Sequence, residues 1–161
     1  MPNSPAINSM TDEAKAWLAG FIDGEGYIGL TFQIKKATPT SARTPRYHPY
    51  LIIANTNKAV IEYIQTILGV GRVYNFFPKN IKFKGAYQIK ISQNNDLQAV
   101  LTAILPYLRV KSEQARIVLD FLARRKDIKP ITSRGHRGAT SFGEADKALY
   151  QRLLDLNKKG P

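Results

Sequence analysis

Residues 17–30, with the sequence WLAGFIDGEGYIGL, constrain the fold of this chain more than any other segment. The first half has the apolar spacing of a short amphipathic helix, and the second half alternates apolar with small or polar residues as a strand does. On the helical wheel the bulky side chains gather on one side, and the other side carries almost none. That small side consists of Ala16, Gly20, Asp23 and Gly24. A helix with a bare face lets another backbone come close, so these four residues predict a helix–helix contact.

Two common glycine motifs do not explain the segment. Gly24, Gly26 and Gly29 match G-x-G-x-x-G, but a dinucleotide site needs a strand before the glycines and a helix after them, and here the order is reversed. A calcium loop starting at Asp23 would place Ile28 where a glycine is required. Two interpretations of the acids remain, a solvated helix end and a functional carboxylate held by glycines beside a close helix pair.

Basic residues dominate the middle of the chain. The net charge is +12, from 24 Lys and Arg against 12 Asp and Glu. Between residues 26 and 95 the only acid is Glu62, against ten lysines and arginines. A surface of one sign predicts binding to a polyanion.

Hydrophobic periodicity and turn signals predict an α+β fold in one domain of ordinary size. Helices are expected at residues 11–23, 58–68, 96–105, 111–125 and 144–156, and strands at 27–36, 46–54, 72–77 and 82–92. Each predicted strand has only one apolar face, so we expect one mixed four-stranded sheet with helices packed on one face.

The predicted strands leave a polar and basic open face opposite the core. The expected inward residues are Ile28, Leu30, Phe32, Ile34, Tyr47, Leu51, Ile53, Tyr87, Ile89 and Ile91. The expected open-face residues are Thr31, Gln33, Lys35, Arg46, His48, Tyr50, Arg72, Tyr74, Lys82, Lys84, Gln88 and Lys90. An ordinary solvent-exposed sheet face would carry acidic as well as basic residues. This composition therefore predicts contact with the major groove of double-stranded DNA.

Residues 18–26, LAGFIDGEG, resemble position by position the signature of the LAGLIDADG homing endonucleases. The resemblance implies that Glu25 and the backbone carbonyl of Gly24 bind a catalytic divalent metal, Mg²⁺ or Mn²⁺, and that Asp23 orders the helix ends. It also implies the fold of that family, with the order helix-strand-strand-helix-strand-strand-helix, over residues 11–126.

The same resemblance extends to two further positions. Asn55 matches the polar residue that positions water near the scissile phosphate, and Lys111 matches the basic residue that approaches that phosphate. From the residues alone, Asn55 can equally be a turn residue and Lys111 a lysine in the first turn of a helix.

The motif occurs once in the chain. One carboxylate does not build the two-metal geometry that clamps both oxygens of a phosphodiester, so we expect a twofold homodimer joined through the bare helix face. Two basic sheets in a row predict a near-palindromic site of ~20 bp. The resemblance implies hydrolysis of one phosphodiester per strand with short 3′ overhangs.

The remaining segments and the composition complete the expectations. Residues 1–10 are expected to be a flexible leader, 11–126 the endonuclease core, and 127–161 a basic loop (133–139) and a C-terminal helix on the same domain. The chain has no cysteine, no apolar run of membrane-spanning length and no secretory leader, which indicates an intracellular protein.

A second function, from another class, is a non-catalytic nucleic-acid-binding protein of the same fold. It would be a maturase bound to its host intron RNA, or a DNA-binding regulator. The composition is compatible with both. The intact sequence around Glu25 favours cleavage, because a binding protein does not need that carboxylate.

Overall fold

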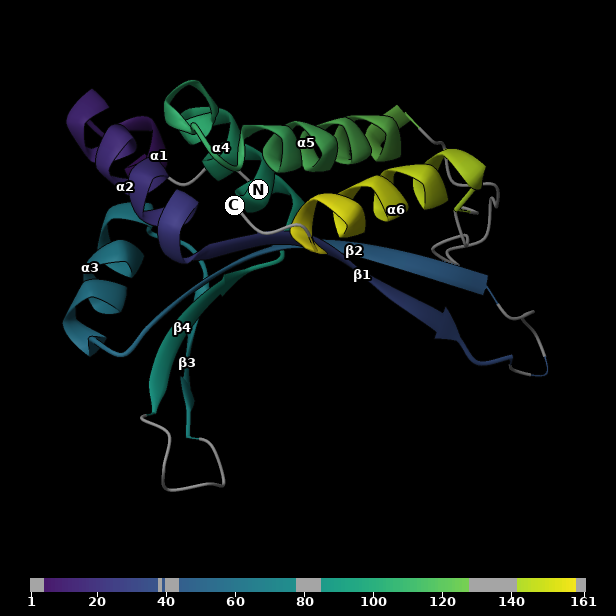
Figure 1. Cartoon of the computed structure of the whole chain (residues 1–161), viewed down its shortest axis with the longest axis horizontal. Coiled ribbons are helices and arrows are strands. Elements are labelled where there is room, and N and C mark those ends of the chain that lie inside the picture. The colour runs from purple at the N-terminus through teal and green to yellow at the C-terminus, as the bar shows by residue number, and fades with distance from the viewer. Residues whose placement is uncertain (1–4, 38, 40–43, 78–84, 128–141, 159–161) are drawn as a thin grey trace.

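The computed structural model describes residues 5–37, 39, 44–77, 85–127 and 142–158 (Figure 1). The elements in chain order are α1 (Pro5–Asn8), α2 (Asp12–Glu25), β1 (Gly26–Lys35), β2 (Thr44–Asn55), α3 (Lys58–Leu68), β3 (Arg72–Phe76), β4 (Ala86–Ile91), α4 (Asn94–Ile104), the 3₁₀ turn η1 (Leu105–Tyr107), α5 (Ser112–Asp127) and α6 (Glu144–Lys158). The predicted class and element order are confirmed. Among these helices, none has the length and apolar character needed to cross a bilayer.

The four strands form one sheet in the order β1-β2-β4-β3, and every neighbouring pair is antiparallel. The prediction of a mixed sheet was wrong in this respect. Strands β2 and β3 do run in the same direction, because α3 carries the chain back between them. However, β4 inserts between β2 and β3 and pairs with both, so no parallel ladder forms.

The helices cover one face of the sheet and leave the other open (Figure 1). Helices α2, α4, α5 and α6 lie above the strands, and α3 packs against β2, β3 and β4. One continuous apolar core fills the space between the two layers. Its fully buried side chains include Leu18, Ile22, Ile28, Leu51, Ile53, Ile61, Ile64, Ile89, Leu101 and Phe121.

Most of the predicted inward residues are buried, and the exceptions are two residues at the far end of β1 and one in β4. Phe32 and Ile34 are 42% and 56% exposed, although their alternation marks them as core. The β1–β2 pair slopes away from the helices toward that end, as Figure 1 shows, so the aromatic contacts of Phe32 with Tyr47 and Tyr150 cover it only partly. Tyr87 in β4 is only half-buried.

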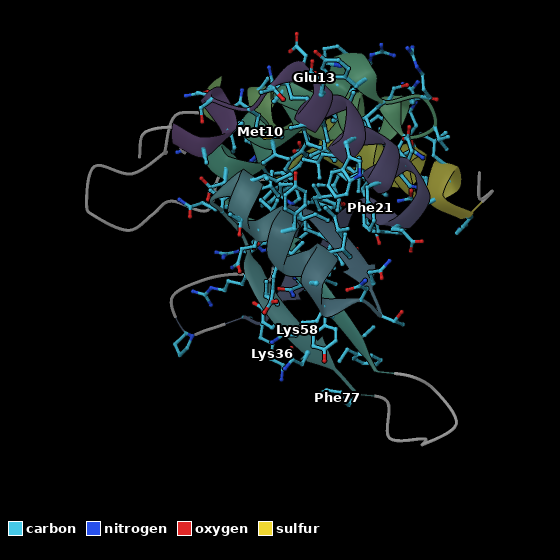
Figure 2. All side chains as sticks on the ribbon, turned by 90° about the vertical axis from the view of Figure 1, so that its left-hand side faces the viewer. Met10, Glu13, Phe21, Lys36, Lys58 and Phe77 are labelled. Atoms are coloured by element: carbon cyan, nitrogen blue, oxygen red, sulfur yellow. The ribbon has the colours of Figure 1, made fainter. Side chains whose placement is uncertain are left out.

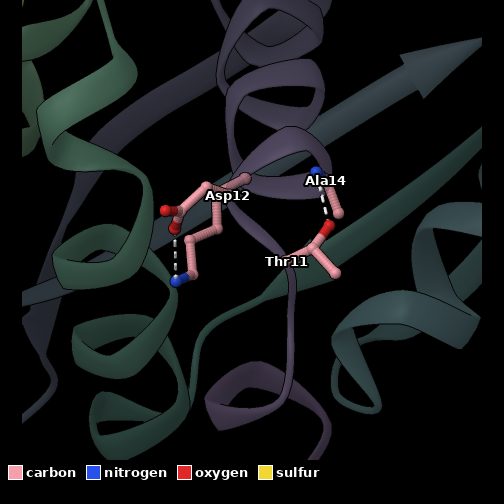
Figure 3. Close-up of polar contacts among 4 residues, drawn as sticks. Thr11, Asp12 and Ala14 are labelled. Carbon is pink, nitrogen blue, oxygen red and sulfur yellow. Dashed lines mark hydrogen bonds and ion pairs between the residues drawn. The ribbon is translucent and has the colours of Figure 1, made fainter.

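Helix ends follow local capping chemistry. The Thr11 hydroxyl accepts a hydrogen bond from the Ala14 amide at 3.2 Å and starts α2 (Figure 3). Asn57 accepts from the Ala59 amide at 3.0 Å and starts α3. Gly69 ends α3 with φ of 66°, a left-handed conformation that favours glycine.

Both ends of the described chain pack on the core. Part of the expected leader folds, since α1 is helical and Ile7 is buried. Helix α6 contacts α5 and β1, and the Asn157 side chain donates a hydrogen bond to the Ile28 carbonyl at 3.0 Å. The predicted basic loop 133–139 lies outside the described residues.

Candidate active site and nucleic-acid interface

The junction of α2 and β1 places the Glu25 carboxylate. Helix α2 ends at Glu25, and β1 begins at the next residue without a loop. A side chain at Gly26 would bring its Cβ to 2.7 Å from the Ile22 carbonyl oxygen, so only glycine fits this turn. Glu25 is consequently exposed at the carbonyl end of a helix, where the helix dipole favours a cation.

Strand register puts this junction in the middle of the sheet. Gly26 pairs with Ile53, and Ile53 pairs with Ile89 of β4. From there the β1–β2 and β3–β4 pairs extend in different directions (Figure 1). Glu25 therefore lies between the two arms of the open face.

Asp23 ties the motif to a segment far away in the sequence. Its carboxylate accepts hydrogen bonds from the Arg109 amide at 2.7 Å and the Lys111 amide at 2.8 Å. The Lys111 ammonium in turn donates to the Asp23 carbonyl. These contacts bring Lys111 to the last turn of α2, the helix that ends at Glu25. They also satisfy the Asp23 carboxylate within its own chain.

Asn55 has a local role at the end of β2. Its side-chain Oδ1 accepts a hydrogen bond from the Asn57 amide at 2.8 Å, which shapes the turn into α3. Asn55 lies two residues beyond Ile53, the partner of Gly26, so it belongs to the same end of β2 as the motif. By strand alternation it shares the side of Ile53, which is the side that the helices cover.

The oxygen donors at this junction suit a hard divalent cation. The Glu25 carboxylate and the Gly24 carbonyl are of the type that Mg²⁺ and Mn²⁺ prefer. Within the described ranges no three His, Cys, Asp or Glu side chains are grouped closely enough to hold a metal. At this junction the chain thus offers two oxygen donors of the kind such a cation prefers, the Glu25 carboxylate and the Gly24 carbonyl.

The bare face of α2 is open in the single chain. A Cβ built on Gly20 or Gly24 would meet nothing within 4 Å, and Ala16 is exposed. Beside them Trp17 stacks on Phe21 at 5.4 Å between ring centroids. Figure 2 looks onto this side, with α2 above α3 and Phe21 labelled.

The aromatic contact continues onto α3 through a residue that the sequence reasoning missed. Tyr63 meets Trp17 edge to face at 5.3 Å, and the two rings are 50% and 41% exposed. We call Trp17, Phe21 and Tyr63 the α2–α3 aromatic cluster. The only sequence signal for it was an aromatic residue off the apolar stripe of α3.

The open face carries the predicted polar and basic residues wherever the structure describes them. Gln33, His48, Arg72 and Tyr74 are exposed, and Thr31, Arg46, Tyr50, Gln88 and Lys90 are half-buried. Lys35 lies on β1, but its side chain falls outside the described set, as do Lys82 and Lys84 entirely. None of the described open-face strand residues is acidic.

Direct cross-strand pairs form a row across the whole sheet. Tyr27 pairs with Ile52, Ile52 with Lys90, and Lys90 with Arg72. The next row contains Gln88 opposite Tyr74. The basic residues of β3 and β4 thus meet an apolar segment of β1 and β2.

Two tyrosines cover Gly29 on this face. The Tyr27 and Tyr50 rings stack at 5.8 Å, and the Lys90 ammonium lies 5.3 Å from the centre of the Tyr50 ring. A Cβ on Gly29 would lie 2.6 Å from the Tyr27 ring, so the stack requires glycine beneath it. Burial, followed by the neighbouring Tyr27, raises the pKa of Tyr50 to about 12.

Comparison with known proteins identifies this architecture. Residues 18–123 match the family model described as LAGLIDADG endonuclease. The chain is 27% identical over 124 residues to DNA endonuclease I-CvuI of Chlorella vulgaris, an alignment that covers 71% of this chain and 66% of that protein, just under two thirds.

Solved structures share the fold at lower identity. I-CvuI in complex with the I-CreI target superposes with a TM-score of 0.60 at 23% identity, over 90% of this chain and 92% of that one. The archaeal intron-encoded homing endonuclease I-Vdi141I, complexed with DNA, gives 0.69 at 18% identity, over 93% and 87%. With the family model covering most of its length, the chain belongs to the LAGLIDADG endonuclease family.

Proposed function

We propose that this protein is a site-specific DNA endonuclease that works as a homodimer and hydrolyses one phosphodiester in each strand. One observation carries the proposal. The exposed carboxylate of Glu25 lies at the centre of a sheet face whose described strand residues include no acid. Such a carboxylate repels DNA unless a cation joins the two, so its presence indicates chemistry rather than binding.

DNA recognition rests on the open face. Arg72 and Lys90 can neutralise phosphates, whereas Gln33 and Arg46 can read base edges in the major groove. Each sheet would follow about one helical turn, ~10 bp, which gives a near-palindromic site of ~20 bp for a dimer. I-CvuI and I-Vdi141I, the relatives of similar fold, are seen bound to DNA.

The dimer rests on the bare face of α2. Two copies could bring Gly20 and Gly24 of each chain together, because nothing in the single chain occupies that space. The α2–α3 aromatic cluster would lose its exposed apolar surface in the same contact. Ala16 lies on the same face of α2. The Asp23 carboxylate accepts a hydrogen bond from its own chain, which holds the end of this helix in place.

The catalytic roles follow the geometry at the α2–β1 junction. Glu25 and the Gly24 carbonyl would hold Mg²⁺ or Mn²⁺, which supplies Lewis-acid polarisation of the phosphate and lowers the pKa of bound water. Lys111 would stabilise the charge that develops on the phosphate. We assign Asn55 to the attacking water by family resemblance, in addition to its turn contact. Short 3′ overhangs are part of the same proposal.

The alternative is a non-catalytic protein of this fold that binds its host intron RNA as a maturase, or regulates DNA. It shares the basic face, so affinity alone does not separate the two functions. Cleavage does. Acting on a genome would also make the protein intracellular.

The decisive experiment selects cleaved duplexes from a randomised library in Mg²⁺ and then compares Glu25→Gln with the parent on the recovered target. We expect nearly unchanged DNA affinity and a cleavage rate lower by several orders of magnitude. Ca²⁺ should support binding without cutting, because it accepts looser geometry and polarises water less. Glu13→Gln, an exposed acid at the other end of α2, is the matched control and should cut like the parent.

Two results would contradict the assignment. One is Glu25→Gln cutting at the parent rate. The other is parent cleavage that persists in excess EDTA. Specific binding of RNA or DNA without any cleavage under these conditions would support the maturase or regulator instead.

A further inference from the structure

The patch formed by Tyr27, Tyr50 and Ile52 is unlike the rest of the open face. Its side chains are uncharged and largely apolar, and it is the only part of the described face where two aromatic rings stack on each other. Tyr27 is 41% exposed even with the stack in place. We call these three residues the tyrosine patch.

The geometry of the tyrosine patch is fixed, because it depends on a glycine. Gly29 faces the same side between the two rings, and any side chain there would collide with Tyr27 and Tyr50. The Lys90 ammonium holds the Tyr50 ring from the β4 side. The patch is therefore a fixed surface rather than two loose side chains.

Its position relates it to the cleavage centre. Tyr27 follows Glu25 by two residues, which is at most about 7 Å of chain. Along a DNA strand that distance corresponds to about two nucleotides. Arg72 and Lys90 lie in the same cross-strand row and would provide the positive charge that holds a duplex against the patch.

We propose that the tyrosine patch contacts thymine 5-methyl groups in the major groove, at the base pairs next to each cleaved phosphodiester. The methyl group is the one apolar feature of the major-groove edge, so it is what an apolar patch can recognise there. Arginine, glutamine or lysine at these positions would instead select guanine or adenine. This inference rests on the proposed function and adds to it a rule for the inner base pairs.

The test uses the target recovered from the randomised library. Synthetic duplexes of that sequence carry deoxyuridine in place of thymidine at one position at a time, which removes only the methyl group. We expect affinity to fall about fourfold at one or two inner positions of each half-site, the factor for exposing one buried methyl group. Replacing cytosine by 5-methylcytosine at an inner position should strengthen binding in parent protein.

Variants connect the effect to the patch. In Tyr27→Ala the deoxyuridine penalty at the inner positions should vanish, and in Tyr27→Phe, which keeps the ring, it should remain. Tyr74→Ala is the matched control, because Tyr74 is an exposed tyrosine of the same face on β3, and it should leave the inner penalty unchanged.

Each remaining outcome overturns the inference. A recovered target without A·T pairs at the inner positions contradicts it, as does deoxyuridine that costs nothing anywhere or costs as much in Tyr27→Ala as in the parent. A protein that selects and cuts a target but ignores the methyl groups refutes the inference alone. A protein that neither binds nor cuts any duplex refutes the proposed function.

Discussion

Replacing Asp23 should weaken the fold and the catalytic site together. The Asp23 carboxylate accepts two backbone hydrogen bonds, from Arg109 at 2.7 Å and Lys111 at 2.8 Å. A hydrogen bond to a charged group contributes ~1.5–3 kcal/mol, and the half-buried position of Asp23 favours the low end. Asp23→Ala should therefore lower the free energy of unfolding by about 3 kcal/mol. Asp23→Asn keeps one acceptor oxygen but presents an NH₂ group to the second amide, so it should cost about 2 kcal/mol.

Urea unfolding with linear extrapolation measures this loss, at one protein concentration so that dimerisation contributes equally. Asp120→Asn is the matched control, because Asp120 is exposed on α5 and should change stability by less than about 0.5 kcal/mol. Cleavage should fall in Asp23→Asn even where the protein is fully folded, since the same contacts hold Lys111 at the end of α2.

The reasoning fails if Asp23→Ala unfolds at the same urea concentration as the parent. It fails in its functional part if Asp23→Asn loses stability as expected but cuts DNA at the parent rate. The first result would mean that other contacts hold the segment before α5. The second would mean that Lys111 does not need the Asp23 contact to reach the phosphate.

Three other predictions follow from the surfaces. Gly20→Ala should raise stability by about 0.5–1 kcal/mol in a monomer, because the new Cβ meets nothing within 4 Å. Gly20→Leu should abolish the dimer mass in light scattering, whereas Ala148→Leu, at an exposed position of α6, should not, and an intact Gly20→Leu dimer would contradict the interface. Lys90→Ala should weaken binding to all duplexes and flatten its salt dependence, whereas Gln33→Ala should relax the sequence preference at one or two base pairs per half-site. If both variants lost affinity equally on every sequence, the assignment of faces would be refuted. The fold raises the pKa of Tyr50 to about 12 from an ordinary 10.0, so it favours the neutral form of the side chain. The stability that this adds is present below pH 10.0 and is lost as the pH rises toward 12. A late step in the near-ultraviolet alkaline titration that Tyr50→Phe fails to remove would contradict this.

Local chemistry explains why so much of the fold was predictable. The caps Thr11 and Asn57 and the stop at Gly69 act within a few residues, so their effect can be read from the letters. Alternation along β2 and β4 likewise identifies the buried face. The all-antiparallel order was not predicted, because the insertion of β4 between β2 and β3 depends on tertiary contacts that the sequence of a single strand does not encode. Phe32 and Ile34 were misassigned because alternation shows which side of the sheet a residue faces, not how closely the helices cover that side.

The candidate site was less predictable for the same reason. The motif identifies Glu25, and family resemblance identifies Lys111, but the hydrogen bonds between Asp23 and residues 109 and 111 join segments 86 and 88 residues apart. One feature of the sequence could have predicted the Tyr27–Tyr50 stack. A glycine at an open-face position of β1, with a tyrosine two residues before it, leaves room for a ring to lie across the strand.

The spacing of the two acids in the motif explains how one helix turn can serve both folding and the chemistry that we propose. Residues two apart on a helix point about 200° apart, so Asp23 and Glu25 must face nearly opposite sides. Asp23 faces the segment of its own chain that carries Lys111, and Glu25 faces out at the start of the sheet. Gly24, between them, keeps the helix surface free of side chains where a second copy would approach. The position of the carboxylate relative to Lys111 is therefore set inside each chain, before any dimer or DNA forms. In the homodimer that we propose, assembly would only have to bring together two half-sites that each chain has already formed.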